Sequence, residues 1–300
     1  MSKRYYVTGG SGFVGSVLEE RIKATNDVFV AMSSNVDIRD EAALTQSLAD
    51  AKPDYVVHLA AQSFVPDSFK DPRATFDVNF YGTLNLLVAL RANDFTGRLL
   101  FVGSGDMYGL VPQDEQPISE GRALKPRNPY AVSKVAAEAL CYQWAQTEAF
   151  GIVMARPFNH IGPGQDPRFA VADFAMQIAR MAKAGEPPVL TAGDVDAARD
   201  FTDVRDIVSA YIALLEEGRP GETYNVCSGT SRPVRELIEE LAAIAGIDLT
   251  IARDPARYRP AEQKRVCGDP AKLRNDTGWA PRIEMRQTLQ DTLDYWLKRL

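Results

Sequence analysis

The chain has 300 residues, 45% of them hydrophobic, and a formal net charge of −6. This length can bury a core for one large or two modest domains, and the acidic balance argues against non-specific binding to nucleic acid. No apolar run approaches the roughly 20 residues of a membrane helix, and no apolar signal segment precedes the first strand. Three widely spaced cysteines and two histidines offer no metal cluster. We therefore expect a metal-free globular protein of the cytoplasm, with reduced thiols and no nucleic-acid or membrane partner.

A glycine-rich turn lies between a first predicted strand, residues 4–8, and a helical segment, residues 16–22. Strand, turn and helix in this order are the context of a dinucleotide-binding fingerprint. We expect Gly9 to allow the tight turn, Gly12 to let the backbone approach a diphosphate, and Gly15 to let helix and strand pack closely. The rest of the expected cofactor turn consists of Ser11, Phe13 and Val14.

A second strand, expected to be buried, covers residues 28–32 and ends at Ser33-Ser34-Asn35. NAD-preferring sites usually have an acidic residue at this point, which binds the ribose 2′-hydroxyl. Two hydroxyls and an amide could instead accept a 2′-phosphate, which favours NADPH and leaves NADH open, although no arginine stands beside the serines. Asp37 and Ile38 could lie at the edge of the adenine, and Asp37 could equally cap a turn.

Two further predicted strands end in small residues, at Leu59-Ala60-Ala61 and at Gly103-Ser104. A helix from about Tyr130 would place Lys134 on the same face, one turn away. Because a nearby cation lowers the pKa of a phenol, Tyr130 could exchange a proton with a sugar oxygen near pH 7. On its own, such a pair is usually solvated. We interpret His58 as structural, and Asn79, in a helix predicted for residues 76–92, as a packing or loop-tying residue.

Together, Thr8 to Gly15, Ala60-Ala61, Ser104 and Tyr130-x-x-x-Lys134 resemble the extended short-chain dehydrogenases/reductases. The resemblance implies a catalytic set of Ser104, Tyr130 and Lys134, with Lys134 also holding the nicotinamide ribose. The alternation of strands and helices predicts an α/β fold, a Rossmann-type doubly wound parallel sheet with a smaller C-terminal lobe. We assign residues 1–165 to the dinucleotide-binding domain, with a return segment near 198–226, and residues 166–300 to the substrate lobe.

Later segments are similar to the sugar-nucleotide branch of that family, especially its GDP-mannose members. They cover residues 155–164, 199–206, 224–226, 259–262 and 278–281. The resemblance implies that Asn159 lies near the substrate diphosphate, that Arg199 and Arg259 clamp it, and that Glu262 reaches a ribose or sugar hydroxyl. Arginine's planar fork suits phosphate oxygens, although either arginine could be a surface ion pair. Ser63 could contact a hexose hydroxyl or cap a helix.

Ser104, Gly105 and Asp106 occupy the segment in which the family's dehydratases carry Thr, then Asp or Ser, then Glu. Gly105 has no proton to give and Asp106 is shorter than Glu, and small misplacements are costly for such chemistry. Dehydration is therefore disfavoured. Epimerising reductases use a Cys and a His, but Asp106 stands where the Cys would be, and residues 168–172 include no histidine.

Reduction of a ketone needs only the groups present, with Tyr130 as proton donor and Ser104 holding the same oxygen. The resemblance implies NAD(P)H-dependent reduction of the C4 ketone of GDP-4-keto-6-deoxy-D-mannose to GDP-D-rhamnose. A nucleotide-sugar 4-epimerase and a GDP-mannose 4,6-dehydratase-like enzyme remain open, and a non-enzymatic NADP-binding sensor is a distant alternative. Family members often pair through the helices around residues 79–90 and 130–146, so a homodimer is expected.

Overall fold

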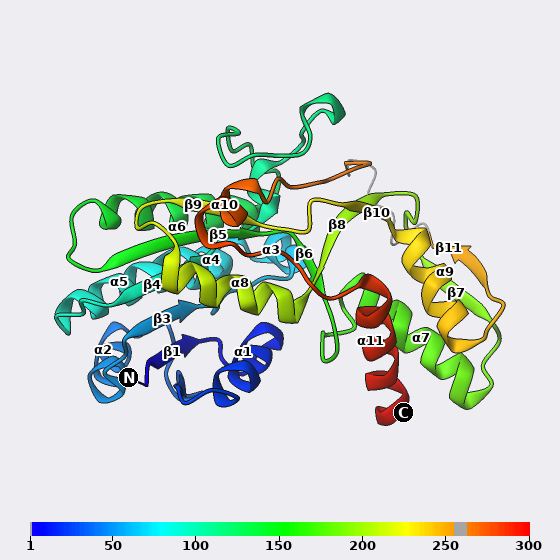
Figure 1. The fold of residues 1–300 in the computed structure, drawn as a ribbon, viewed down its shortest axis with the longest axis horizontal. Coiled ribbons are helices and arrows are strands. Elements are labelled where there is room, and N and C mark those ends of the chain that lie inside the picture. The colour runs from blue at the N-terminus through cyan, green and yellow to red at the C-terminus, as the bar shows by residue number, and fades with distance from the viewer. Residues whose placement is uncertain (1, 255–262) are drawn as a thin grey trace.

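The computed structural model describes residues 2–254 and 263–300. Its centre is a six-stranded sheet in which every neighbouring pair of strands is parallel (Figure 1). In spatial order the strands are β2 (Val28–Ala31), β1 (Arg4–Thr8), β3 (Tyr55–His58), β4 (Arg98–Val102), β5 (Gly151–Pro157) and β9 (Thr223–Val226). The chain passes from β1 to β2 on one side and then to β3 on the other, so β1 and β3 flank the point at which ligands bind in such sheets.

Helices cover both faces of this sheet, which confirms the predicted Rossmann-type fold. One face packs against α1 (Phe13–Lys23), α8 (Val204–Glu217) and α10 (Ala271–Thr277), and the other against α2 (Glu41–Ala51), α5 (Gly82–Ala92) and α6 (Pro129–Ala145). Strand β1 illustrates the cause. Successive side chains of a strand point to opposite faces, so Tyr5 joins the first core and Tyr6 the second.

The prediction of a buried second strand is wrong. Strand β2 lies at the edge of the sheet, and none of its four residues is fully buried. Its apolar composition suits a strand in either position, because an edge strand still packs one face against the core. Sequence composition alone therefore could not separate the two.

The helix predicted for residues 76–92 is interrupted. A short helix, α4 (Pro72–Phe76), leads into a π turn, η1 (Asp77–Tyr81), before α5 begins. The amide of Gly82 accordingly donates to the carbonyl of Asp77, five residues earlier. Such π turns insert a residue into a helix and are frequent at functional sites. This turn holds Asn79, which is buried.

A further core lies in the C-terminal part, on the right in Figure 1. It contains α7 (Ala170–Ala184), α9 (Val234–Ala245) and α11 (Met285–Arg299), beside the parallel pair β7 (Val189–Ala192) and β11 (Thr250–Arg253). Leu289 and Leu293 are buried there and Trp296 packs against this core, so one side of the last helix is apolar.

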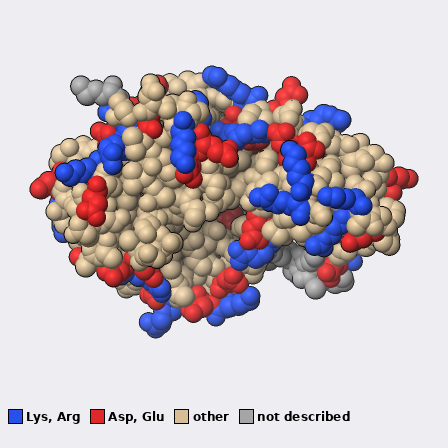
Figure 2. Space-filling model, turned by 90° about the horizontal axis from the view of Figure 1, so that it is seen from below, with Lys and Arg blue, Asp and Glu red and all other residues tan. Residues whose placement is uncertain are grey.

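A small sheet lies between these parts, made of β6 (Asn159–Ile161), β8 (Ala198–Asp203) and β10 (Ser231–Pro233). Three short elements follow the strand ends of the main sheet: α3 (Val65–Lys70), η2 (Gly105–Tyr108) and η3 (Gln113–Glu115). In the described ranges, no helix combines the length and apolar character needed to cross a membrane. Figure 2 shows one face, on which positive and negative side chains are interspersed over both parts of the molecule.

Candidate functional site

The turn after β1 has the geometry that a diphosphate-binding turn needs. Gly9 has a φ of +70°, and a Cβ added to it would lie 2.8 Å from the amide nitrogen of Ala60. Gly12 is the N-cap of α1, and a Cβ on Gly15 would overlap the backbone of Gly10. The glycines thus let the turn after β1, the start of α1 and the segment after β3 approach one another closely. Gly15 makes room for the turn itself rather than for a strand. The N-terminus of α1, which favours anions, opens beside Ala60 at the β1–β3 switch point.

The segment after β2 contains a cation, Arg39, that was not among the predicted site residues. Ser33 accepts a hydrogen bond from the amide of Asn35, and Ser34 is exposed. Arg39 forms a two-pronged ion pair with Asp37, and these hydrogen bonds lower the pKa of Asp37 to about 2. Asp37 also caps a turn through the Arg39 amide, and Ile38 is buried against Gly82. Arg39 could have been noticed from the spacing, because an arginine two residues after an aspartate can fold back onto it.

Tyr130 and Ser104 come together at the carboxyl edge of the sheet. Asn128 caps α6 by accepting from the amide of Ala131, and Pro129 occupies the first turn, which fixes where the helix begins. Ser104 follows β4 and caps η2 in the same way through the amide of Asp106. The Ser104 hydroxyl lies near the Tyr130 phenol and lowers its pKa. The structure therefore brings together two of the three predicted catalytic side chains.

Lys134 lies one turn along the same helix but engages the backbone. Its ammonium donates to the carbonyl of Val102 at 2.8 Å and lies 5.2 Å from the centre of the Phe101 ring. Burial lowers the pKa of Lys134 to about 8. The expectation that this lysine lowers the pKa of Tyr130 is wrong here. The pKa of Tyr130 is raised, first by burial and then by the charge of Asp106, while the nearby Ser104 hydroxyl lowers it.

Gly105 leaves little room for a side chain. A Cβ at this position would lie 3.2 Å from the ring of Phe158, which is buried. Asp106 is exposed, yet its charge acts on the Tyr130 phenol. The acidic pair that the family's dehydratases carry therefore lacks one member here, and the Phe158 ring crowds the position of its side chain.

The residues expected to bind substrate come from separate elements. Asn159 begins β6, Arg199 lies in β8 beside it in the small sheet, and Ser63 is exposed before α3. The residue next to Arg199, Asp200, is fully buried. Its carboxylate accepts from the amides of Ser228, Gly229 and Gly268, so it joins three segments. Arg259 and Glu262 lie outside the described residues.

A buried ion pair braces the catalytic helix, and sequence reasoning missed it. Glu138, four residues after Lys134, receives hydrogen bonds from Arg156 on β5. Arg156 also donates to the Tyr108 hydroxyl, which in turn donates to Asn225 on β9. The continuation of the i, i+4 spacing from Tyr130 through Lys134 to Glu138 was the available signal.

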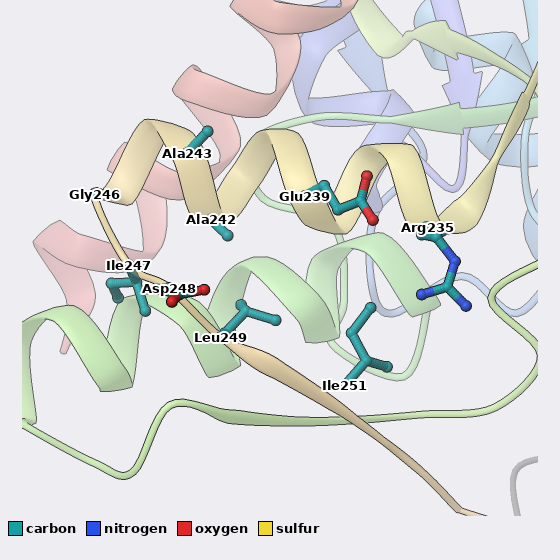
Figure 3. A pocket seen from close by; sticks show the side chains of 9 residues that line it. All are labelled: Arg235, Glu239, Ala242, Ala243, Gly246, Ile247, Asp248, Leu249 and Ile251. Carbon is teal, nitrogen blue, oxygen red and sulfur yellow. The ribbon is translucent and has the colours of Figure 1, made fainter.

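Two surface depressions lie away from the candidate site. One of about 520 Å³ is lined by one side of α9 and by residues 246–251 of the C-terminal part (Figure 3). Its nine lining residues include none of the predicted site residues. No group of three or more potential metal-ligating side chains occurs in the described part of the chain.

Three comparisons relate this geometry to known proteins. A family model described as GDP-mannose 4,6 dehydratase matches residues 32–292. GDP-6-deoxy-D-mannose reductase of Pseudomonas aeruginosa is 48% identical, over 100% of this chain and 99% of that protein. The solved structure of RMD from Pseudomonas aeruginosa complexed with NADPH superposes with a TM-score of 0.93 at 46% identity, covering 100% of both chains.

The GDP-mannose 4,6-dehydratase of Vibrio cholerae is more distant, at 31% identity over 85% of this chain and 76% of that protein. The matches to the reductase and to the RMD structure cover the whole chain, including both the turn after β1 and the Tyr130 helix, whereas the family model begins after that turn. The chain therefore belongs to the GDP-mannose 4,6-dehydratase family of NAD(P)-dependent nucleotide-sugar oxidoreductases, within the extended short-chain dehydrogenases/reductases.

Proposed function

We propose that this protein reduces the C4 ketone of GDP-4-keto-6-deoxy-D-mannose to GDP-D-rhamnose with NADPH. The observation that carries the proposal is the contact between Ser104 and Tyr130 at the sheet edge, next to a glycine where a dehydratase has an acid. Full-length similarity to a GDP-6-deoxy-D-mannose reductase supports the same substrate class. Similarity to a structure that contains NADPH supports the cofactor, with NADH as the less favoured choice.

The chain's own residues fit a dinucleotide. The turn at Gly9 and Gly12 would hold the diphosphate at the N-terminus of α1, with Gly9 packed closely against the backbone of Ala60. Ser33, Ser34 and Arg39 supply two hydroxyls and a cation near the end of β2, a donor set suited to a 2′-phosphate. Ser11, Phe13, Val14, Asp37, Ile38, Leu59 and Ala61 complete the proposed cofactor site. We assign this site to residues 1–165 with the return segment near 198–226, and the sugar to residues 166–300.

Bound NADPH supplies the hydride to C4. Tyr130 would donate its phenolic proton to the oxygen that becomes an alkoxide, since its raised pKa keeps it protonated at neutral pH. Ser104 would donate a hydrogen bond to the same oxygen. Lys134 would hold the nicotinamide ribose from its place on the next turn of α6.

The substrate's diphosphate would be held by cations in an otherwise acidic protein. We propose Arg199 and Arg259 as the clamp, because arginine bonds two phosphate oxygens at once. Asn159 would add a hydrogen bond beside them. Glu262 and Ser63 would contact hydroxyl groups of the ribose or the hexose, and Gly105 and Asp106 would face the sugar.

The deciding experiment supplies GDP-4-keto-6-deoxymannose and NADPH and follows both absorbance and product by NMR. We expect one NADPH consumed for each GDP-rhamnose formed. An epimerase would interconvert sugars without net consumption, and a dehydratase would act on GDP-mannose instead. Either of those results would contradict the proposal.

Replacement of Tyr130 by Phe tests the proton donor. We expect kcat to fall by about 10²–10⁴-fold, the usual contribution of a positioned acid, with NADPH still bound. Tyr142→Phe is the matched control, because that phenol is exposed on the same helix. A Tyr130→Phe protein as fast as its parent would show that the proton comes from another group.

We further propose that the protein is a homodimer of the cytoplasm. Tyr81, Val132 and Tyr142 are exposed on η1 and α6, within the region expected to pair. The three cysteines are free and buried, as suits a reducing compartment.

A further inference from the structure

Three side chains, those of Thr8, His58 and Thr83, form a buried hydrogen-bond chain beneath the candidate site. The amide of Ala60 donates to the Thr8 hydroxyl at 3.2 Å, and that hydroxyl lies 2.7 Å from Nδ1 of His58. Nε2 of His58 lies 2.9 Å from the Thr83 hydroxyl, which donates to the carbonyl of Asn79 at 2.7 Å. Thr8, His58 and Thr83 are almost completely buried. Solvent therefore cannot replace any of these bonds.

The direction of every bond follows from counting hydrogens. Thr83 has one hydroxyl hydrogen, and Asn79 receives it, so Thr83 must accept from His58. Nε2 of His58 therefore carries a proton. In a neutral imidazole Nδ1 is then an acceptor, so the Thr8 hydroxyl donates to it, while the Thr8 oxygen also accepts from the Ala60 amide. Burial and the charge of Lys134 lower the pKa of His58 to about 3, which agrees with a neutral ring.

The two ends of the chain touch the two halves of the candidate site. Ala60 packs against Gly9 in the dinucleotide turn. At the other end, the Asn79 amide group donates to the Ser133 hydroxyl on the catalytic helix and to the carbonyl of Gln62, and it accepts from the Gln62 amide. Ser133 donates to the carbonyl of Tyr130. The π turn carrying Asn79 thus contacts both the segment after β3 and the first turn of α6.

We propose that His58 and Thr83 are positioning residues, which hold the π turn, and through Asn79 the Tyr130 helix, at a fixed distance from the dinucleotide turn. The histidine acts as a rigid spacer of fixed tautomer between two hydroxyls. This inference deepens the proposed function and rests on it. Small shifts of a catalytic group relative to the reacting carbon are enough to reduce the rate strongly.

Thr83→Val breaks the hydrogen-bond chain without altering any residue proposed to contact the cofactor or the substrate. We expect kcat to fall about tenfold or more, with KM for NADPH and for the keto sugar within about threefold of the parent values. Thr83→Ser retains the hydroxyl and should restore kcat to within about threefold. Thr292→Val is the matched control, because that buried threonine makes the same bond to the carbonyl four residues earlier, but in the C-terminal part. It should leave kcat unchanged.

The tautomer of His58 can be measured in the parent protein, so it tests the inference even if Thr83→Val does not fold. The chain has only two histidines, so ¹⁵N-labelled imidazoles give a spectrum that His160→Asn assigns. We expect a neutral His58 with its proton on Nε2 at pH 7. A proton on Nδ1 would overturn the inference. A Thr83→Val protein that keeps the parental kcat would also overturn it, as would a Thr292→Val protein whose kcat falls as much as that of Thr83→Val. A parent protein that binds NADPH but does not reduce the keto sugar would instead refute the proposed function, and the imidazole spectrum would still test the chain.

Discussion

The pKa values of Tyr130 and Lys134 shift in other directions than their spacing suggests. Burial raises the pKa of the phenol, so Tyr130 holds its proton across the neutral range and is prepared to donate it. Lys134 has its pKa lowered to about 8 and is therefore the member of the pair that titrates near physiological pH. Loss of a proton from the Lys134 ammonium would weaken its hydrogen bond to the Val102 carbonyl.

The pH dependence should report Lys134. Since kcat/KM reflects the free enzyme, kcat/KM for NADPH should be level below pH 8 and fall about tenfold per unit above it, as the ammonium becomes neutral. The sign follows from the lowered pKa of a cation, whose charged form is lost as pH rises. Lys134→Arg, which stays protonated, should move this decline to higher pH. A profile that stays level in the parent well above pH 8 would contradict the assignment.

Gly105 is a packing requirement as well as a missing acid. Gly105→Asp should destabilise the protein by about 1–3 kcal/mol, because its Cβ meets the Phe158 ring, and it should not create turnover of GDP-mannose. Urea unfolding and a GDP-mannose assay measure the two effects. Gly121→Asp is the control, since a Cβ there has open space. Equal stability of the two variants would argue against the predicted clash.

Among the elements, α6 is joined to the sheet by a buried network that begins at Glu138. The Arg156–Glu138 pair joins it to β5, and Arg156 continues through Tyr108 on η2 to Asn225 on β9. Arg156 also lies 5.0 Å from the centre of the Tyr108 ring. Because η2 begins directly after Ser104, this network holds the Ser104 segment against the helix that carries Tyr130.

Glu138→Leu should be strongly destabilising. It leaves the Arg156 guanidinium buried without its carboxylate, which typically costs about 3–5 kcal/mol. Glu222→Leu is the matched control, because its pair with Lys272 is partly exposed and should cost about 1 kcal/mol or less. The midpoints of urea unfolding measure both changes. Similar losses in the two variants would mean that the buried pair has no special role.

At the scale of the whole molecule, the face formed by η1 and α6 presents Tyr81, Val132 and Tyr142 to solvent. If this face pairs two copies, Tyr142→Glu should convert a dimer into monomers at micromolar concentration, because a buried charge opposes association. Light scattering measures the mass. Val189→Glu alters a similarly exposed apolar residue in the C-terminal part and should leave the mass unchanged. A dimer that survives Tyr142→Glu would place the contact elsewhere.

Much of this architecture was determined by the sequence alone. The glycine spacing at residues 9, 12 and 15 predicted a turn whose conformation Gly9 adopts, and strand and helix periodicity predicted the sheet and its covering helices. These signals are local, because φ, side-chain alternation and helix repeat depend on near neighbours. The same locality explains how Tyr130 and Lys134 were recognised as a pair.

Contacts between distant segments were decided only by the tertiary structure. The edge position of β2, the pairing of Glu138 with Arg156 and the hydrogen-bond chain through His58 all depend on segments that are far apart in sequence, and no local pattern predicts which of them meet. The raised pKa of Tyr130 likewise depends on the tertiary structure. Spacing along a helix predicts which charges are near, but the desolvation that dominates this phenol depends on everything packed around it.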